Sequence, residues 1–206
     1  MVPVSILIFV LSVGQILVNL IRTLKVKDFV DYLVYSGALS KFMSGQNPYH
    51  FLYGQLSDKI PFNYPPSSLL VLSPFHFLPI KAGEVLLTVL SFASICLVIW
   101  LVIKLCKVRG ILSMFLALGP CFVQAYPVTF TLILGQVNLI VLALTVLSIY
   151  LYVTHTYKHS YLLAIVLLGL ASSLKIFPLL LLPLFLLKKD YKFTFSVLGI
   201  FLIFNF

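Results

Sequence analysis

Apolar segments separated by short polar ones recur along most of this chain. About 20 apolar residues in a helix cross the hydrocarbon core of a bilayer, where every backbone N–H and C=O group must be paired. The pattern therefore predicts membrane-spanning helices. We expect these spans near residues 4–21, 84–103, 111–128, 139–153, 161–174, 177–187 and 193–206.

The composition agrees with this pattern. Of the 206 residues, 62% are hydrophobic and only 9% are charged, and the mean hydropathy is +1.15. We therefore predict an all-α, multi-pass protein of the plasma membrane, with residues 1–206 in a single transmembrane domain. The last apolar segment reaches Phe206 without a polar flank, so we expect the chain to be the N-terminal part of a longer protein.

The net charge of +9 can be explained by the membrane topology. Lysines and arginines gather in residues 104–109 and 188–192 and at Lys158, between apolar segments. Short basic loops are typical of the cytoplasmic side, which places residues 22–82 and the surroundings of Gly135 and Lys175 outside. A nucleic-acid partner is not needed to explain the basic balance and is not expected.

The outer loop, residues 22–82, is predicted to begin with a helix that lies at the membrane interface. An apolar stripe at helical spacing consists of Val30, Leu33, Val34, Gly37, Ala38 and Phe42. A second face consists of Asp28, Asp31, Tyr32, Tyr35 and Ser36. We expect the first face to contact the membrane and the second to contact water, and the helix to end at "SGQNPY".

Two carboxylates stand near the start of this helix, in a chain with only 5 acidic residues. Asp28 suits two roles equally, an N-cap or a catalytic group. Asp31 suits a first-turn carboxylate that complements the helix dipole, with a chemical role as the alternative.

Further polar residues interrupt apolar surroundings. In "LGQVNL", Gln136 and Asn138 can hydrogen-bond a neighbouring helix or a ligand. In "SSLKIFPLLLLP", Lys175 marks a functional site or extends toward the interface. Tyr64 begins a Pro-rich stretch, residues 62–79, which is either a rigid connector or a short helix that turns back toward the membrane. The histidines have no ligand spacing with carboxylates or thiols, so no metal site is predicted.

Taken together, these stretches resemble a known family. The blocks "DFVDY", "SGQNPY", "FNYPPSSLLVLSPFHFLP", "GQVNLIVLAL" and "SSLKIFPLLLLPLFLLKK" occur in this order over nearly the whole chain. They look like glycosyltransferase family 87, the polyprenol-phosphate-mannose-dependent α-mannosyltransferase type with the GT-C fold. The resemblance implies a longer integral membrane enzyme that transfers a hexose, mannose above all, to an acceptor hydroxyl on the outer face.

The resemblance also implies roles for individual residues. Enzymes with the GT-C fold have an essential Asp in the first outer loop, and Asp28 of "DFVDY" matches it, with Asp31 as the second candidate for the base. Lys175 is the candidate for contacting the leaving lipid phosphate, because negative charge develops there. The other residues predicted to bind the substrate or its phosphate are Gln136, Asn138, Tyr32 and Tyr64.

The expected partners are membrane lipids, a polyprenyl-phosphate sugar as co-substrate, and a glycan or glycolipid acceptor. Neither a cofactor nor a divalent metal is expected. Two other classes of protein remain as alternatives. A transporter or lipid-linked-sugar flippase would show repeated halves with matching helix breaks, which are not visible here. A membrane scaffold would tolerate replacement of Asp28 and Lys175.

Overall fold

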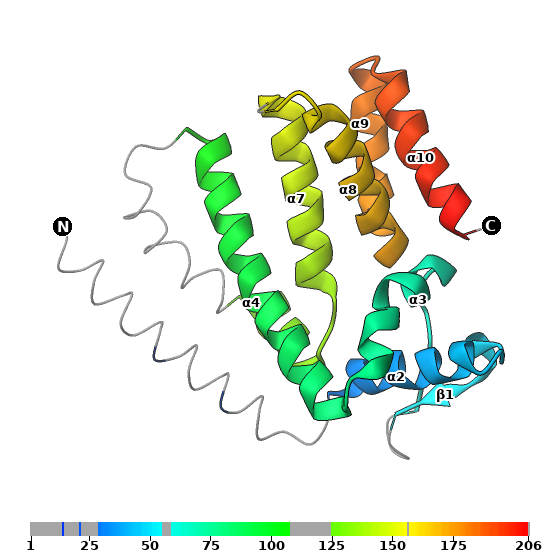
Figure 1. Cartoon of the computed structure of the whole chain (residues 1–206). Coiled ribbons are helices and arrows are strands. Elements are labelled where there is room, and N and C mark those ends of the chain that lie inside the picture. The colour runs from blue at the N-terminus through cyan, green and yellow to red at the C-terminus, as the bar shows by residue number, and fades with distance from the viewer. Residues whose placement is uncertain are drawn as a thin grey trace.

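A computed structural model describes residues 29–54, 59–107, 125–155 and 157–205, together with positions 14 and 21. Over this part of the chain the protein is built from helices, as the hydrophobic pattern predicts (Figure 1). The exception is a small antiparallel pair of strands in the outer loop, β1 (Leu52–Tyr53) and β2 (Ile60–Pro61), which the sequence did not predict.

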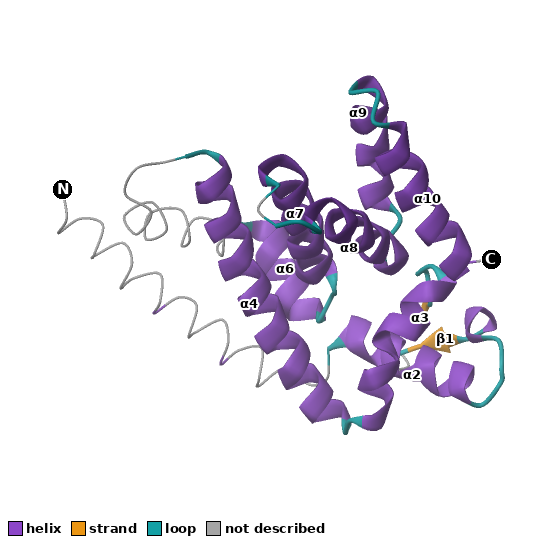
Figure 2. Ribbon diagram, turned by 45° about the horizontal axis from the view of Figure 1, so that its top comes forward, coloured by secondary structure: helices purple, strands orange, loops and turns teal. Residues whose placement is uncertain are grey.

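Four helices lie side by side and form the body of the molecule (Figures 1 and 2). They are α4 (Ile80–Leu105), α7 (Asn138–Thr154), α8 (Ser160–Leu174) and α10 (Tyr191–Asn205). Helix α7 packs against both α4 and α8, and α8 packs against α10. The Ser148 hydroxyl donates across to the Ala164 carbonyl at 2.6 Å, so α7 and α8 are joined by a hydrogen bond as well as by apolar contacts.

Among the described helices, α4 is long and apolar enough to cross a membrane, with 26 residues and a hydropathy of 2.7. Helices α7, α8 and α10 cover the predicted ranges 139–153, 161–174 and 193–206 to within a few residues, but each is shorter than 18 residues. Membrane crossing by these three therefore stays a prediction. The predicted span 4–21 lies outside the described residues apart from positions 14 and 21, and so does most of 111–128.

Helix α6 (Tyr126–Leu134) begins inside the predicted span 111–128 and extends to Gly135, while residues 111–124 of that span lie outside the described residues. The predicted range 177–187 is helical between the same bounds, but it consists of two pieces, a 3₁₀ helix, η3 (Phe177–Leu181), and the short helix α9 (Leu182–Leu187). Pro178 and Pro183 stand near the starts of these two pieces, and a proline cannot donate the hydrogen bond that would continue one helix through both.

Helix α2 (Val30–Met43) lies across one end of the four-helix body (Figure 1). It is followed by η1 (Pro48–His50) and the strands, and then by α3 (Pro66–Leu72) and η2 (Ser73–Phe77). Helix α3 is the short helix considered for residues 62–79, and it contacts α2, α8 and α10. The Asn205 side chain accepts hydrogen bonds from the backbone N–H and the hydroxyl of Ser67, which attaches α3 to the end of α10.

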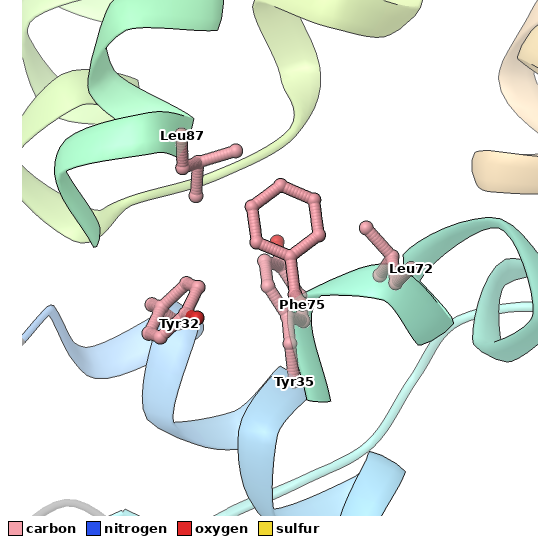
Figure 3. A pocket seen from close by; sticks show the side chains of 5 residues that line it. All are labelled: Tyr32, Tyr35, Leu72, Phe75 and Leu87. Atoms are coloured by element: carbon pink, nitrogen blue, oxygen red, sulfur yellow. The ribbon is translucent and has the colours of Figure 1, made fainter. Parts of the chain in front are cut away.

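The faces of α2 differ from those predicted. Tyr32 and Tyr35, predicted to face water, are each 2% exposed, and Val34 and Ala38 of the predicted membrane stripe are buried within the protein, at 3% and 0%. The two tyrosines line a small apolar pocket with residues of α3, η2 and α4 (Figure 3). A tyrosine can be buried in this way when its hydroxyl keeps a hydrogen-bond partner, as that of Tyr35 does with Tyr64. The helix therefore docks through both tyrosines together with part of its apolar stripe.

The two ends of the body differ in character. The α2 end, which carries α2, α3 and the α6–α7 connection, contains the described carboxylates Asp31 and Glu84. The opposite end, here called the basic end, is formed by the C-terminus of α4 and by the α7–α8 and α9–α10 connections (Figure 1). The lysines at the basic end are Lys104, Lys107, Lys158, Lys188, Lys189 and Lys192.

At the basic end, Asp190 accepts hydrogen bonds from three different helices. It precedes α10 directly and accepts the Phe193 N–H at 3.0 Å, as an N-cap does. It also accepts the hydroxyls of Tyr161 (2.8 Å) and Tyr152 (3.0 Å), which belong to α8 and α7. Burial alone would raise the pKa of Asp190, but these three donors outweigh it and lower the pKa below the usual 3.8. One carboxylate therefore connects three helices.

We expect Asp190→Ala to lower the free energy of unfolding by about 1–2 kcal/mol, because the cap is lost. The melting temperature in detergent should fall by about 2–4 °C per kcal/mol. Since folding lowers the pKa of Asp190, this stabilisation is present above pH 3.8 and is lost as the pH falls through the lower, folded-state pKa. Asp190→Asn, which keeps a capping oxygen, is the control and should retain most of the stability. Equal melting temperatures for all three proteins would contradict this role.

Candidate active site

The α2 end brings together most of the residues predicted to form a site. Asp31 stands in the first turn of α2, Gln136 in the α6–α7 connection, and Lys175 directly after α8. The Gln136 side chain hydrogen-bonds the Asp31 carboxylate, and the positive charge of Lys175 acts on the same carboxylate. Three segments far apart in the sequence thus contribute a carboxylate, an amide and a cation to one half-buried site.

The local backbone explains how Gln136 reaches this position. Gly135 ends α6 in the left-handed conformation, with φ of 68°, which a residue with a side chain rarely adopts. A Cβ atom at Gly135 would also lie 2.7 Å from the Cβ of Phe29, so only glycine fits against the start of α2. The Gln136 N–H then returns to the Thr131 carbonyl at 3.0 Å. The turn holds the amide side chain beside α2.

Asn138 supports Gln136 from the first turn of α7. Its amide nitrogen donates to the Gln136 side-chain carbonyl and, at 3.2 Å, to the Thr131 hydroxyl. The Asn138 side-chain oxygen is buried and has no hydrogen-bond partner. A buried polar atom without a partner is costly, so this oxygen is an acceptor available to a ligand hydroxyl or a water molecule.

Tyr64 and Tyr35 form the wall beside Lys175. The Lys175 ammonium lies 5.1 Å from the centre of the Tyr64 ring, within the range of a cation–π contact. The hydroxyls of Tyr64 and Tyr35 are 2.7 Å apart. Burial raises the pKa of Tyr64 to about 12 and that of Tyr35 well above 10.0, so both hydroxyls stay protonated at neutral pH. They are hydrogen-bonding groups here and do not supply charge.

Asp31 is the titratable group of the site that could act as a base. Burial raises the pKa of its carboxyl above the usual 3.8, and the Gln136 hydrogen bond and the charge of Lys175 oppose this rise without cancelling it. A carboxylate with a raised pKa is a better proton acceptor near neutral pH, because its affinity for the proton is greater.

Two predicted residues do not belong to this described group. Asp28 lies outside the described residues, so its role stays a prediction. The N-cap position of the described helix α2 is Phe29, whose side chain makes no capping hydrogen bond. Tyr32 points elsewhere: its ring packs edge-on against Phe75 at 6.1 Å, and it lies near Glu84 of α4. Its assignment to phosphate binding is not supported by any of these contacts.

Two residues near the site were missed. Tyr35, four positions after Asp31, was placed on the same face of the helix as Asp31 but was not predicted as a site residue. Glu84 was taken only as the start of a span, although a lone carboxylate beginning an apolar segment is itself a signal. It is 5% exposed and accepts the backbone N–H of Phe29 at 2.7 Å.

The apolar pocket of Figure 3 is a separate feature. It is lined by Tyr32, Tyr35, Leu72, Phe75 and Leu87, and it encloses no space for even a water molecule. Ligand pockets usually have about 300–1,000 Å³. This pocket is therefore too small for a sugar with its phosphate, and the polar group around Asp31 is the better candidate site.

The described residues thus bring a carboxylate, a lysine and two amides together at one end of a helical bundle. Comparison with known proteins specifies the class. Residues 62–206 match the model of glycosyltransferase family 87, and the chain belongs to this family.

A curated relative is the polyprenol-phosphate-mannose-dependent alpha-(1-2)-phosphatidylinositol mannoside mannosyltransferase of Mycobacterium tuberculosis. It is 26% identical over 155 residues, which cover 69% of this chain and 35% of the relative. The chain thus spans about a third of that protein's length. No solved structure matches the chain significantly.

The electrostatics of the site can be tested without a substrate. Lys175→Met should raise the pKa of Asp31 further, because a positive charge that favours the ionised carboxylate is removed. The pKa is measured from the carboxyl ¹³C shift of labelled aspartate during a pH titration. Lys41→Met, at the other end of α2, is the matched control and should leave it unchanged. A shift of equal size in both variants would contradict the arrangement.

Proposed function

We propose that this chain is part of a multi-pass membrane glycosyltransferase. The enzyme transfers a hexose, mannose above all, from a polyprenyl-phosphate sugar to an acceptor hydroxyl of a glycan or glycolipid on the outer face of the plasma membrane. The family of the chain and the activity of its mycobacterial relative support the donor class. The single structural observation that carries the proposal is the group of Asp31, Gln136 and Lys175 at one end of the body.

The reaction needs a base and a site for a leaving phosphate. The acceptor hydroxyl oxygen forms a bond to the anomeric carbon, and its proton passes to an aspartate, Asp28 or in second place Asp31. The bond between the anomeric carbon and the phosphate oxygen breaks, and the polyprenyl phosphate leaves with the electron pair. Lys175 and the Gln136 amide stabilise the charge that develops on this phosphate.

The distribution of charge supports an outer location for the site. Six of the ten described lysines lie at the basic end, and short positive connections remain in the cytoplasm. Lys41, Lys59 and Lys81 lie in the long loop of residues 22–82, and loops of about 60 residues largely escape this rule. The α2 end, where Asp31 and Lys175 lie, is then on the outer side. A lipid-linked donor fits this placement, because its polyprenyl chain remains in the bilayer while its phosphate meets the interfacial helix α2.

The test uses the full-length protein in liposomes with radiolabelled polyprenyl-phosphate sugars, mannose first. Asp28→Asn should lower the transfer rate by about 10²- to 10⁴-fold, the usual contribution of a general base. Asp31→Asn should lower the transfer rate by a smaller factor, because Asp31 interacts with Lys175 and Gln136, which are proposed to contact the phosphate. Asp190→Asn makes the same chemical change at the basic end and should transfer normally.

The outcomes separate the claims. A larger loss in Asp31→Asn than in Asp28→Asn would move the role of the base to Asp31. Normal transfer in both variants would contradict the assignment of the base to either aspartate. A wild-type protein that transfers no sugar from any lipid-linked donor would contradict the proposed function and make transport the next activity to assay.

A further inference from the structure

The start of α2 is held by a residue of another helix. Glu84, in the first turns of α4, is 5% exposed. One of its carboxylate oxygens accepts the Phe29 N–H at 2.7 Å, and the other contacts the Lys81 ammonium at 3.0 Å. The N–H that Glu84 accepts belongs to the peptide bond joining Asp28 to Phe29.

A carboxylate in this position suits a helix that lacks a cap of its own. The first N–H groups of a helix have no partner within it, and Phe29, the N-cap residue of α2, offers no side-chain hydrogen bond. Glu84 supplies both an acceptor and a negative charge at the positive end of the α2 dipole. Since burying a carboxylate is costly unless it is well paired, its presence here calls for a specific role.

Two further contacts restrict the same segment. A Cβ atom at Gly83 would overlap the Tyr32 hydroxyl, and one at Gly135 would lie 2.8 Å from Cδ2 of Phe29. The side chains of Phe29 and Tyr32 therefore pack closely against the α6–α7 turn and the start of α4, so residues 29–32 are enclosed between these two segments. We call these five residues, Phe29, Tyr32, Gly83, Glu84 and Gly135, the α2 clamp. Asp31 lies within the enclosed segment.

We propose that Glu84 is a positioning residue, which fixes Asp31 at the start of α2 relative to Lys175 and Gln136 through its hydrogen bond to the Phe29 N–H. This inference rests on the proposed function, since it assigns Glu84 a part in the same reaction. Glu84 touches neither the donor nor the acceptor. Its effect reaches the reaction through the position of the α2 backbone, where a displacement of about 1 Å can cost 10²-fold in rate.

The experiment compares three variants of the full-length protein. Glu84→Ala removes the acceptor of the Phe29 N–H, and Glu84→Gln keeps an acceptor without the charge. Thr88→Val is the matched control, because Thr88 lies one turn further along α4, is buried, and donates to the backbone carbonyl of Glu84 at 2.8 Å, so its loss leaves the Glu84 carboxylate in place. Amide hydrogen exchange over residues 29–35 reports on the clamp, and kcat and the donor KM report on the reaction.

We expect Glu84→Ala to exchange faster at the start of α2 and to lose about 10- to 100-fold in kcat, with little change in the donor KM. Glu84→Gln should restore both properties, and Thr88→Val should match the wild type. Normal kcat in Glu84→Ala, failure of the Gln variant to restore it, or an equal loss in Thr88→Val would each overturn the inference. A wild type inactive with every donor would instead overturn the proposed function, while the exchange data would still show whether Glu84 holds α2.

Discussion

The docking of α2 across the end of an apolar bundle is the constraint on which the rest of the site depends. A helix that buries a face must keep partners for every polar group on that face. Here Tyr35 shares a hydrogen bond with Tyr64, and the Phe29 N–H is accepted by Glu84. With these partners the aromatic face of α2 can be buried, and the helix is fixed where its first turn meets the α6–α7 connection.

The same docking determines the electrostatics of Asp31. Burial disfavours the charge of its carboxylate, whereas Gln136 and Lys175 favour it, and the outcome is a raised pKa. In a low-dielectric setting these interactions are stronger than in water. A small movement of α2 therefore changes both the pKa of Asp31 and its electrostatic interaction with Lys175. At the basic end, Asp190 does the opposite, because its three donors stabilise its charge and lower its pKa.

The sequence allowed much of the fold to be predicted, because apolar segments of helical length are read directly from composition and spacing. It also indicated Asp31, Gln136 and Lys175 as candidate site residues, because they are polar or charged residues among apolar segments. The burial of Tyr32 and Tyr35 was not predictable from the pattern on α2, since tyrosine suits either face and the choice depends on Tyr64 and Phe75, 29 or more residues away. The role of Glu84 was missed for the same reason: its partner is a backbone N–H 55 positions earlier, which no local spacing reveals.

The most direct test of this account is a structure of the full-length protein bound to polyprenyl monophosphate, the leaving group of the proposed reaction. We predict that the phosphate lies at the α2 end, within hydrogen-bonding distance of the Lys175 ammonium and beside the Gln136 amide, with the polyprenyl chain directed toward the bilayer. A phosphate bound at the basic end, beside Lys188 to Lys192, would contradict the account.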